Sequence, residues 1–190
     1  MDDLVWYAGY GSNLDPDRFA CYLMGGRPPG ATRTYPGTRD RSPALETRPF
    51  AMPGRLIFAW KSPTWGGAIA FHDPGGDGQV LSTAYLLTRR TFSDLIEQEM
   101  WRVPGADHDL TEVLAMRRHE LGPGRYETLH LTGELDGRPV LTFSTADPGA
   151  LEPGEPAPSY LATMARGLRA VHGLSDAEID AYLAPGRQRR

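Results

Sequence analysis

The residues most able to do chemistry lie near the N-terminus, where the apolar segment 4–8 leads into the glycine-rich segment 9–14. Glycines let the backbone approach a ligand closely because they carry no side chain. Asp15 and Pro16, which follow, are typical of the first positions of a helix. Free N–H groups at a helix N-terminus attract anions and carbonyl oxygens. The pattern therefore predicts either a binding loop for such a group or a tight structural turn.

Nucleotide-binding motifs do not fit this loop. The glycines at positions 9 and 11 begin a Gly-x-Gly-x-x-Gly pattern, but Leu14 stands where the third glycine is required. No Gly-Lys-Ser/Thr sequence follows, so a P-loop does not fit either. Ser12 lacks the second glycine of the Gly-x-Ser-x-Gly turn that presents a nucleophilic serine. The pattern alone therefore leaves a tight structural turn and a binding loop without a nucleotide motif as the two interpretations.

A second segment carries a carboxylate where an apolar residue is expected. Residues 89–103 are predicted to form a helix whose apolar stripe consists of Phe92, Leu95, Ile96 and Val103. Glu99 falls within that stripe, whereas Glu97 and Gln98 are expected at its solvent-exposed sides. Burial raises the pKa of a carboxyl group and suits it to acid or base catalysis near neutral pH. The alternatives are that Glu99 only borders the stripe or pairs with a buried arginine.

Composition and cysteine usage limit the classes of function. The 190-residue chain fits one domain over residues 1–184, followed by a basic tail, 185–190, that is expected to be disordered. A net charge of −4 argues against a nucleic-acid partner, and a single cysteine excludes an internal disulfide and a cysteine-based zinc site. No apolar run reaches the roughly 20 residues of a membrane span, and no leader segment is recognised. We therefore expect a cytoplasmic protein without a membrane partner.

No metal site is expected from the sequence. The histidines are scattered without the spacing of metal ligands, at His72, His108, His119, His130 and His172. The acidic, glycine-rich segment 73–78 resembles a calcium-binding loop only superficially, because it lacks the spaced ligands and the closing glutamate. A hairpin turn is the favoured interpretation of that segment.

The elements that must position these residues favour an α+β fold. Strands are predicted at residues 4–10, 55–61, 66–72, 80–88, 125–134 and 138–145, the last two joined by Asp136-Gly137. Helices are predicted at residues 16–24, 89–103 and 109–121, from a cap at Ser159 to Gly173, and after a capping box at Ser175 and Glu178. Residues 25–54 are predicted to be a long loop with at most one short extended piece. Strands interrupted by helices favour α+β over strict βαβ alternation.

Together these features resemble the gamma-glutamylcyclotransferase-like superfamily. The resemblance is carried by Tyr10-Gly11-Ser12-Asn13-Leu14, Trp65-Gly66-Gly67, Leu95-Ile96-Glu97-Gln98-Glu99 and Pro158-Ser159-Tyr160. It implies a small mixed, mostly antiparallel β-barrel with flanking helices, a site at the mouth of the barrel, and Glu99 as the catalytic residue. The substrate-binding residues that it implies are Tyr10, Gly11, Ser12, Asn13, Leu14, Trp65, Gly66, Tyr126 and Tyr160.

The activity implied by the resemblance is cyclisation of a γ-glutamyl group, which releases 5-oxoproline and a free amine. Glu99 would act as general base and then as acid on a small-molecule substrate, without metal or cofactor, in a monomer or homodimer. Two alternatives stay open: removal of a γ-glutamyl group from a biosynthetic intermediate or γ-glutamyl amine, and a non-catalytic small-molecule-binding module. Segments 27–54 and 104–122 depart from the family pattern and could wall or gate the pocket.

Overall fold

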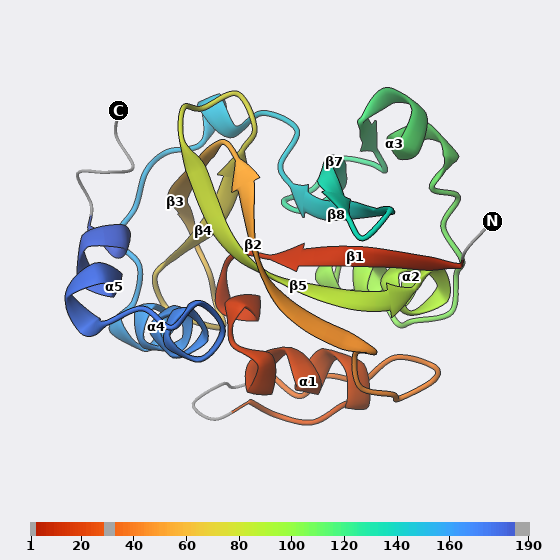
Figure 1. Cartoon of the computed structure of the whole chain (residues 1–190), viewed down its shortest axis with the longest axis horizontal. Coiled ribbons are helices and arrows are strands. Elements are labelled where there is room, and N and C mark those ends of the chain that lie inside the picture. The colour runs from red at the N-terminus through yellow and green to blue at the C-terminus, as the bar shows by residue number, and fades with distance from the viewer. Residues whose placement is uncertain (1–2, 29–32, 185–190) are drawn as a thin grey trace.

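The computed structural model describes residues 3–28 and 33–184, so the predicted basic tail lies outside the described residues (Figure 1). The strands are β1 (Leu4–Gly9), β2 (Glu46–Pro53), β3 (Arg55–Lys61), β4 (Ala68–Asp73), β5 (Gln79–Thr88), β6 (Arg118–Glu120), β7 (Thr128–Leu135) and β8 (Arg138–Ser144). The helices are α1 (Pro16–Met24), α2 (Arg89–Glu99), α3 (Thr111–Met116), α4 (Pro158–His172) and α5 (Asp176–Leu183), with short 3-10 helices η1 (Ser12–Leu14) and η2 (Pro148–Ala150). The assignment of residues 1–184 to one domain stays a prediction.

The strands pair in two sheets. The larger sheet has the order β2-β5-β1-β8-β7-β6, and β3 and β4 form the smaller one. Strands β1 and β8 run parallel, whereas the other paired strands run antiparallel. The helices lie around the sheets, with α4 and α5 at one end of the molecule and α3 at the other (Figure 1). The predicted α+β class, with mixed, mostly antiparallel strands and flanking helices, is thus confirmed. The strands, for which the resemblance implies a β-barrel, pair in the described residues as two sheets.

Strand β1 lies inside the larger sheet, as its continuous apolar sequence predicts. Successive side chains of a strand point to opposite faces. Trp6 and Ala8 therefore join the core cluster that includes residues of α4, whereas Val5 and Tyr7 join the cluster that includes residues of α1 and α2. Because β1 is held between two core layers, the glycine-rich loop that follows it starts from a fixed position.

Three predicted helix ends are confirmed by their capping contacts. Asp15 Oδ1 accepts a main-chain N–H of α1 at 3.1 Å, and Thr88 Oγ1 accepts one of α2 at 3.1 Å. Ser175 and Glu178 form the predicted capping box of α5. Such caps satisfy N–H groups that the helix itself leaves without partners.

The start of α4 differs from the prediction. Its N-cap is Ala157 and its first residue is Pro158, so Ser159 lies inside the first turn and does not cap the helix. Proline suits the first helical position because its ring fixes φ and its missing N–H is not needed there. This position places Tyr160 in the first turn of α4.

The segment 25–54 contains more regular structure than predicted. Its last part forms β2, an eight-residue strand that pairs along β5, from Glu46 opposite Leu86 to Pro53 opposite Gln79. The prolines of this segment favoured a loop interpretation, but proline is tolerated in a strand at the edge of a sheet. Strand β2 occupies such an edge.

The helix predicted over residues 89–103 ends at Glu99. Trp101 adopts a left-handed backbone conformation, with φ of 62°, which cannot continue the helix. Val103 therefore leaves the apolar stripe and is 80% exposed. The helix predicted over residues 109–121 is also shorter, because Arg117 is left-handed, with φ of 64°, and β6 follows it.

Glu97 and Gln98 are buried, although the helical pattern predicts exposed positions for both. The chain after α2 folds back over this side of the helix, so the Glu97 carboxylate lies 3.0 Å from Arg102 Nε and 2.7 Å from His108 Nε2. Gln98 Nε2 donates a hydrogen bond to the Tyr22 carbonyl of α1 at 2.9 Å. Helical periodicity does not anticipate this burial because the covering segments are tertiary neighbours.

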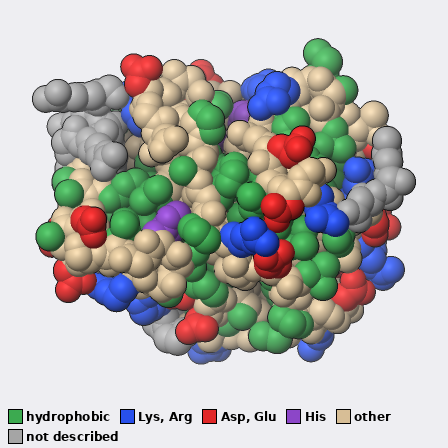
Figure 2. All heavy atoms as spheres, viewed as in Figure 1, with side chains coloured by type: hydrophobic (Ala, Val, Ile, Leu, Met, Phe, Trp, Pro, Cys, Tyr) green, Lys and Arg blue, Asp and Glu red, His purple; other side chains and the backbone are tan. Residues whose placement is uncertain are grey.

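The surface shows no separation of charge on the face seen in Figure 2, where acidic and basic side chains lie among apolar ones. In the described ranges, no helix has the length and apolar character that a membrane crossing needs. One cavity, in contrast, has mostly basic groups in its wall, where the guanidinium groups of Arg18, Arg33 and Arg125 lie around the carboxyl group of Glu99.

Candidate active site

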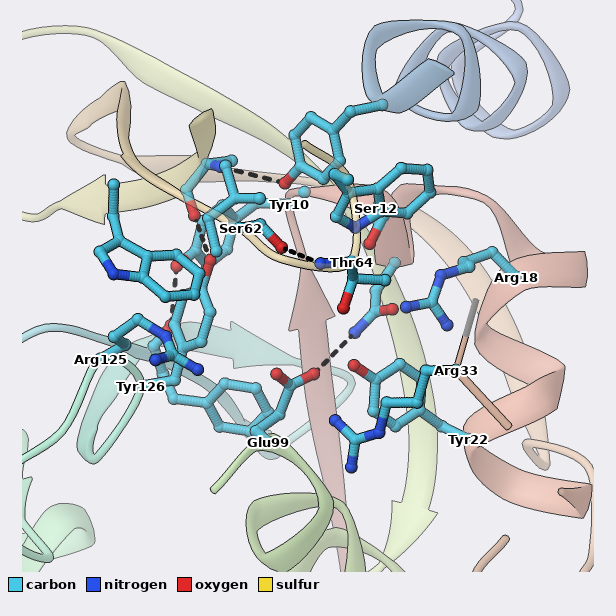
Figure 3. A pocket seen from close by; sticks show the side chains of 18 of the residues that line it. Tyr10, Ser12, Arg18, Tyr22, Arg33, Ser62, Thr64, Glu99, Arg125 and Tyr126 are labelled. Carbon is cyan, nitrogen blue, oxygen red and sulfur yellow. Dashed lines mark hydrogen bonds between the residues drawn. The ribbon is translucent and has the colours of Figure 1, made fainter. Parts of the chain in front are cut away.

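A cavity of about 80 Å³ lies where the end of β1, helix α1, the end of α2 and the turn after β3 meet (Figure 3). Its wall contains most of the predicted site residues, namely Tyr10, Gly11, Ser12, Asn13, Trp65, Glu99, Tyr126 and Tyr160. Residues that no motif predicts also line it, among them Arg18, Tyr22, Arg33, Trp60, Trp101 and Arg125. The fold thus brings residues from distant parts of the chain to one cavity.

Two predicted site residues do not line this cavity. The side chain of Leu14 is buried, and its carbonyl accepts a hydrogen bond from Thr83 Oγ1 at 2.8 Å. Gly66 has φ of 76°, a conformation that favours glycine, and its N–H donates to the Ser62 carbonyl at 2.7 Å. Leu14 thus attaches the glycine-rich loop to strand β5 on the side away from the cavity, and Gly66 stabilises the turn that contains Trp65.

Glu99 is the last residue of α2, and its carboxyl group points into the cavity (Figure 3). Asn13 Nδ2 donates to the Tyr7 hydroxyl at 3.0 Å and to Glu99 Oε1 at 3.4 Å. Burial raises the pKa of Glu99, although a hydrogen bond from Tyr22 and the positive charge of Arg18 act in the opposite direction. A carboxyl group with a raised pKa can exchange protons closer to neutral pH.

The glycine-rich loop is fixed by side chains of strand β5. Residues 12–14 form the single turn η1, in which the Leu14 N–H donates to the Gly11 carbonyl at 3.0 Å. The Tyr85 hydroxyl donates to the Asn13 carbonyl at 2.8 Å. Because these contacts hold the loop from the side of the core, its other side, at Gly11, Ser12 and Asn13, faces the cavity.

Two tyrosine hydroxyls in the cavity wall bind the main chain of strand β4 at Ala70. The Tyr160 hydroxyl accepts the Ala70 N–H at 3.0 Å, and the Tyr126 hydroxyl donates to the Ala70 carbonyl at 2.6 Å. Burial raises the pKa of both tyrosines, so both phenols are neutral at physiological pH. They can position the wall of the cavity or donate hydrogen bonds, but they are unsuited to act as bases.

Arg18, which no sequence motif marks, is the most unusual group in the cavity wall. Its side chain is buried in α1, and its NH2 donates to the Tyr35 hydroxyl at 2.6 Å. The guanidinium stacks over the rings of Tyr22 and Tyr35, at 4.9 and 4.6 Å from their centroids. Arg18 Nε and NH1 have no hydrogen-bond partner in the described part of the chain. A buried guanidinium with unused donors can bind a carboxylate.

A sequence signal for Arg18 exists in its helical position. Arg18 lies one helical turn before Tyr22, on the face of the amphipathic helix that carries Phe19, Tyr22 and Leu23. This is the same kind of misplaced charge that draws attention to Glu99. An arginine near an apolar stripe is nevertheless often explained by its long aliphatic stem, so only the structure shows that the charged group itself is buried.

Gly11 tolerates no side chain because of Tyr160. A Cβ at position 11 would lie 2.5 Å from the Tyr160 hydroxyl, so Gly11→Ala should displace either the loop or the tyrosine. We expect activity to fall by about 100-fold, the scale of a 1 Å misplacement of catalytic groups. Gly105→Ala is the control, since its Cβ would meet no atom within 4 Å. Equal activity of the two variants, measured with the same substrate, would show that the Gly11 contact has no catalytic importance.

The groups that face the cavity offer proton transfer and anion binding: a carboxyl group, guanidinium groups, neutral phenols and main-chain N–H groups. In residues 3–28 and 33–184, no three His, Cys, Asp or Glu side chains are grouped so as to hold a metal ion. The arrangement fits reactions in which a carbonyl carbon is attacked and a proton is transferred.

Comparison with known proteins adds information on the fold. No protein-family model matches the chain. A protein of Arabidopsis thaliana described as Histone deacetylase 5 is 30% identical over 199 aligned residues, which include 94% of this chain. The chain spans only 30% of the length of that relative. Its described activity therefore belongs to the much longer protein.

Solved structures extend the comparison to three dimensions. The crystal structure of an uncharacterized protein from Homo sapiens is 18% identical, with a TM-score of 0.54, over 96% of this chain and 88% of that chain. This chain has the fold of that human protein. A gamma-glutamyl cyclotransferase (16% identity, TM-score 0.49) matches over 95% of this chain and 87% of its own. The Bacillus subtilis protein YkqA (18% identity, TM-score 0.49) matches over 95% of this chain and 53% of its own. Identities this low concern the fold alone.

Proposed function

We propose that this chain cyclises a γ-glutamyl group, with release of 5-oxoproline and a free amine, and that Glu99 is its general base and acid. The observation that supports this proposal most strongly is the position of the Glu99 carboxyl group. It faces the glycine-rich loop across the cavity, and its Oε1 atom lies 3.4 Å from Asn13 Nδ2. Acyl transfer needs a proton acceptor on one side of the carbonyl group and hydrogen-bond donors for the oxyanion on the other.

The reaction requires few catalytic groups because it is intramolecular. Glu99 takes a proton from the α-ammonium group of the substrate, and the free amine attacks the γ-carbonyl carbon, which closes a five-membered ring. The bond between that carbon and the leaving nitrogen then breaks as Glu99 returns its proton to that nitrogen. The ring nitrogen gives its second proton to the released amine, so the products are a neutral lactam and an ammonium ion. Holding the substrate in a folded conformation removes much of the entropic part of the barrier.

The glycine-rich loop is the proposed site for the developing oxyanion. The main-chain N–H groups of Gly11, Ser12 and Asn13 belong to a loop that is fixed before substrate binds, through the contacts of Tyr85 and Thr83 with its carbonyl groups. Donors that are already oriented need no rearrangement as charge develops. Removal of one such donor typically costs about 3 kcal/mol of transition-state stabilisation.

Arg18 is the proposed receptor for the α-carboxylate of the glutamyl group. Its buried guanidinium keeps two donor nitrogens without partners in the described residues, and it lies close enough to Glu99 to lower the pKa of that carboxyl group. A charge-assisted hydrogen bond from one of these nitrogens would hold the α-carbon near Glu99. The cavity of about 80 Å³ is small compared with sites for drug-sized ligands, which agrees with a compact head group.

The pH dependence follows from the raised pKa of Glu99. The base must be ionised to accept the proton, so kcat/KM should fall as the pH decreases through the pKa of Glu99. Because burial raises that pKa, the fall should begin at a higher pH than an ordinary glutamate would give. A pH profile of 5-oxoproline formation measures this. An acidic limb centred on the usual glutamate pKa would contradict the role given to Glu99.

The decisive experiment is a substrate panel. The purified protein is incubated with γ-glutamyl amino acids and γ-glutamyl amines, and 5-oxoproline and the free amine are measured by mass spectrometry. Release of both supports the proposed reaction, and the preferred leaving amine distinguishes dipeptide turnover from removal of a γ-glutamyl group in biosynthesis. Calorimetric binding of these compounds without turnover would instead favour a non-catalytic binding module.

The two segments that depart from the family pattern contribute differently to the site. Segment 27–54 supplies Arg33 and Tyr35 to the cavity wall, so it can influence substrate choice. No described residue of segment 104–122 lines the cavity, which contradicts the idea that this segment walls it. It packs instead against the outer side of α2, where His108 contacts Glu97.

A further inference from the structure

Tyr22 of α1 lies beside both charged groups on which the proposed reaction depends. In the cavity, its hydroxyl group and the Glu99 carboxyl group point toward one another (Figure 3), and the hydroxyl donates a hydrogen bond to the carboxylate. The Arg18 guanidinium lies over the ring of Tyr22, 4.9 Å from its centroid. One side chain therefore contacts the proposed base and also the proposed receptor for the α-carboxylate.

The ring of Tyr22 is held in place by its neighbours in the protein. The side chain is buried, and its ring centroid lies 4.3 Å from that of Tyr35 and 6.2 Å from that of Phe19. The main chain is held as well, because the Tyr22 carbonyl accepts a hydrogen bond from Gln98 Nε2 at 2.9 Å. Since Gln98 directly precedes Glu99, this contact joins α1 to α2 beside the base. The hydroxyl group thus has a defined position relative to the carboxylate.

The hydroxyl group distinguishes Tyr22 from an aromatic residue that only fills the core. Phenylalanine would make the same ring contacts, but it would donate nothing to Glu99. A buried carboxylate needs hydrogen-bond donors from the protein because little water reaches it. Asn13 Nδ2 supplies a long contact, at 3.4 Å from Glu99 Oε1. The Tyr22 hydroxyl is therefore an important second donor to this carboxylate.

We propose that Tyr22 is a positioning residue for Glu99, whose ionised carboxylate it holds in the orientation that accepts the substrate's proton. This inference rests on the proposed function. A hydrogen bond to a carboxylate favours the ionised form, so the contact with Tyr22 lowers the pKa of Glu99 against the effect of burial. Burial raises the pKa of Tyr22 itself, so its hydroxyl stays a neutral donor at physiological pH.

A change in activity at mildly acidic pH can be assigned to a carboxyl group in this site. The other ionisable side chains that line the cavity with Glu99 are Arg18, Arg33, Arg125, Tyr7, Tyr10, Tyr22, Tyr35, Tyr126 and Tyr160. Arginine and tyrosine side chains ionise at much higher pH. Glu127 lines an adjoining cavity together with Glu99, and its carboxylate lies 3.8 Å from Arg102 NH1. Glu99 and Glu127 are therefore the two carboxyl groups that the test must distinguish.

The kinetic test removes the hydroxyl group alone. In Tyr22→Phe, the acidic limb of kcat/KM for 5-oxoproline release should move to higher pH, because the ionised form of Glu99 loses a donor. On the plateau, kcat should fall by about tenfold, the scale of one hydrogen bond to a charged group. KM should change less than kcat, because the ring beside Arg18 is kept. An unmoved limb or an undiminished kcat would overturn the inference and leave the proposed reaction intact.

Tyr182→Phe is the matched control for the loss of a buried hydroxyl group. Tyr182 is buried in α5, does not line the cavity, and accepts the Leu81 N–H at 2.9 Å through its hydroxyl oxygen. This variant should keep the pH profile and kcat of the unaltered protein, even where its Tm is lower. If Tyr182→Phe moved the acidic limb as far as Tyr22→Phe does, the shift would reflect lost stability and the inference would fail.

A titration without substrate separates this inference from the proposed reaction. In protein with isotope-labelled glutamate side chains, NMR follows the carboxyl resonances, and those of Glu99 and Glu127 are identified by their absence from Glu99→Gln and Glu127→Gln. The titration midpoint of Glu99 should lie at higher pH in Tyr22→Phe than in the unaltered protein. Equal midpoints would overturn the inference. A shifted midpoint in a protein that forms no 5-oxoproline would keep the hydrogen bond but refute both the proposed function and the positioning role.

Discussion

Replacement of Glu99 by glutamine is expected to lower kcat for 5-oxoproline release by at least about 100-fold, the usual contribution of a positioned acid–base group. Glutamine keeps the size of the side chain and a hydrogen bond with Asn13, but it neither accepts nor returns the proton. The substrate should still bind, so KM should change much less than kcat. Turnover by Glu99→Gln at the rate of the unaltered protein would show that Glu99 is not the base.

Thermal stability provides a second measurement on the same variant. Burial raises the pKa of Glu99 in the folded protein above its value in the unfolded chain. The corresponding stability is fully present below the unfolded pKa and is lost as the pH rises through the folded pKa. Glutamine does not ionise, so the Tm of Glu99→Gln relative to that of the unaltered protein should increase from mildly acidic to alkaline pH. A constant difference in Tm would contradict the burial of an ionisable carboxyl group.

The neighbouring carboxylate is the matched control for this experiment. Glu97 contacts Arg102 and His108 on the other side of α2 and does not line the cavity. Glu97→Gln should therefore lower stability, because it weakens buried charged contacts, yet kcat should stay within a few-fold of the original value. If kcat falls strongly in Glu99→Gln but not in Glu97→Gln, while stability falls in Glu97→Gln, the effect of Glu99 on catalysis is separated from an effect on folding.

Replacement of Arg18 by methionine is expected to raise KM for a γ-glutamyl substrate by about 10- to 100-fold, the scale of a lost charge-assisted contact. The chemical step depends on Glu99 and should be affected less, so kcat should fall by a smaller factor. Arg18→Lys keeps the charge but not the planar pair of donors and should give an intermediate KM. Steady-state kinetics of 5-oxoproline release measures both constants.

A shortened substrate distinguishes carboxylate binding from a purely structural role of Arg18. A γ-aminobutyryl amide is a γ-glutamyl amide without the α-carboxylate, and it cyclises to 2-pyrrolidinone. The unaltered protein should strongly prefer the γ-glutamyl compound, and Arg18→Met should lose most of that preference. Arg48→Met, which changes an exposed arginine outside the cavity, should keep it. Undiminished preference in Arg18→Met would place the α-carboxylate elsewhere in the site.

Much of the fold can be predicted from the sequence because local interactions decide it. The caps at Asp15, Thr88 and Ser175 use side chains within one helical turn of the groups they satisfy. The hairpin turn at Asp136-Gly137 and the limits of β3 depend on neighbours in the chain in the same way. Strand β2 is not predictable in this way, because prolines are tolerated in a strand only at the edge of a sheet and the position of a strand within a sheet is not a local property.

In the candidate site, too, the features set by local interactions can be predicted from the sequence, whereas those set by tertiary packing cannot. A glycine-rich turn after an apolar strand and a glutamate within an apolar stripe are visible in the sequence, because periodicity relates each residue to its own element. The burial of Glu97 and the exposure of Val103 depend on how the chain after α2 folds back, and the burial of Gln98 depends on the packing of α1 against α2.

The sequence by itself determined the two elements on which the proposed reaction depends, the loop at Gly11–Asn13 and the carboxylate of Glu99. Only the tertiary structure showed that they face one another and that Arg18, Arg33 and Arg125 contribute to the wall around them. The physical reason is that burial and electrostatic environment arise from groups far apart in the chain. A residue's own segment fixes its backbone conformation, whereas its pKa and unused hydrogen-bond donors are set by the segments packed against it.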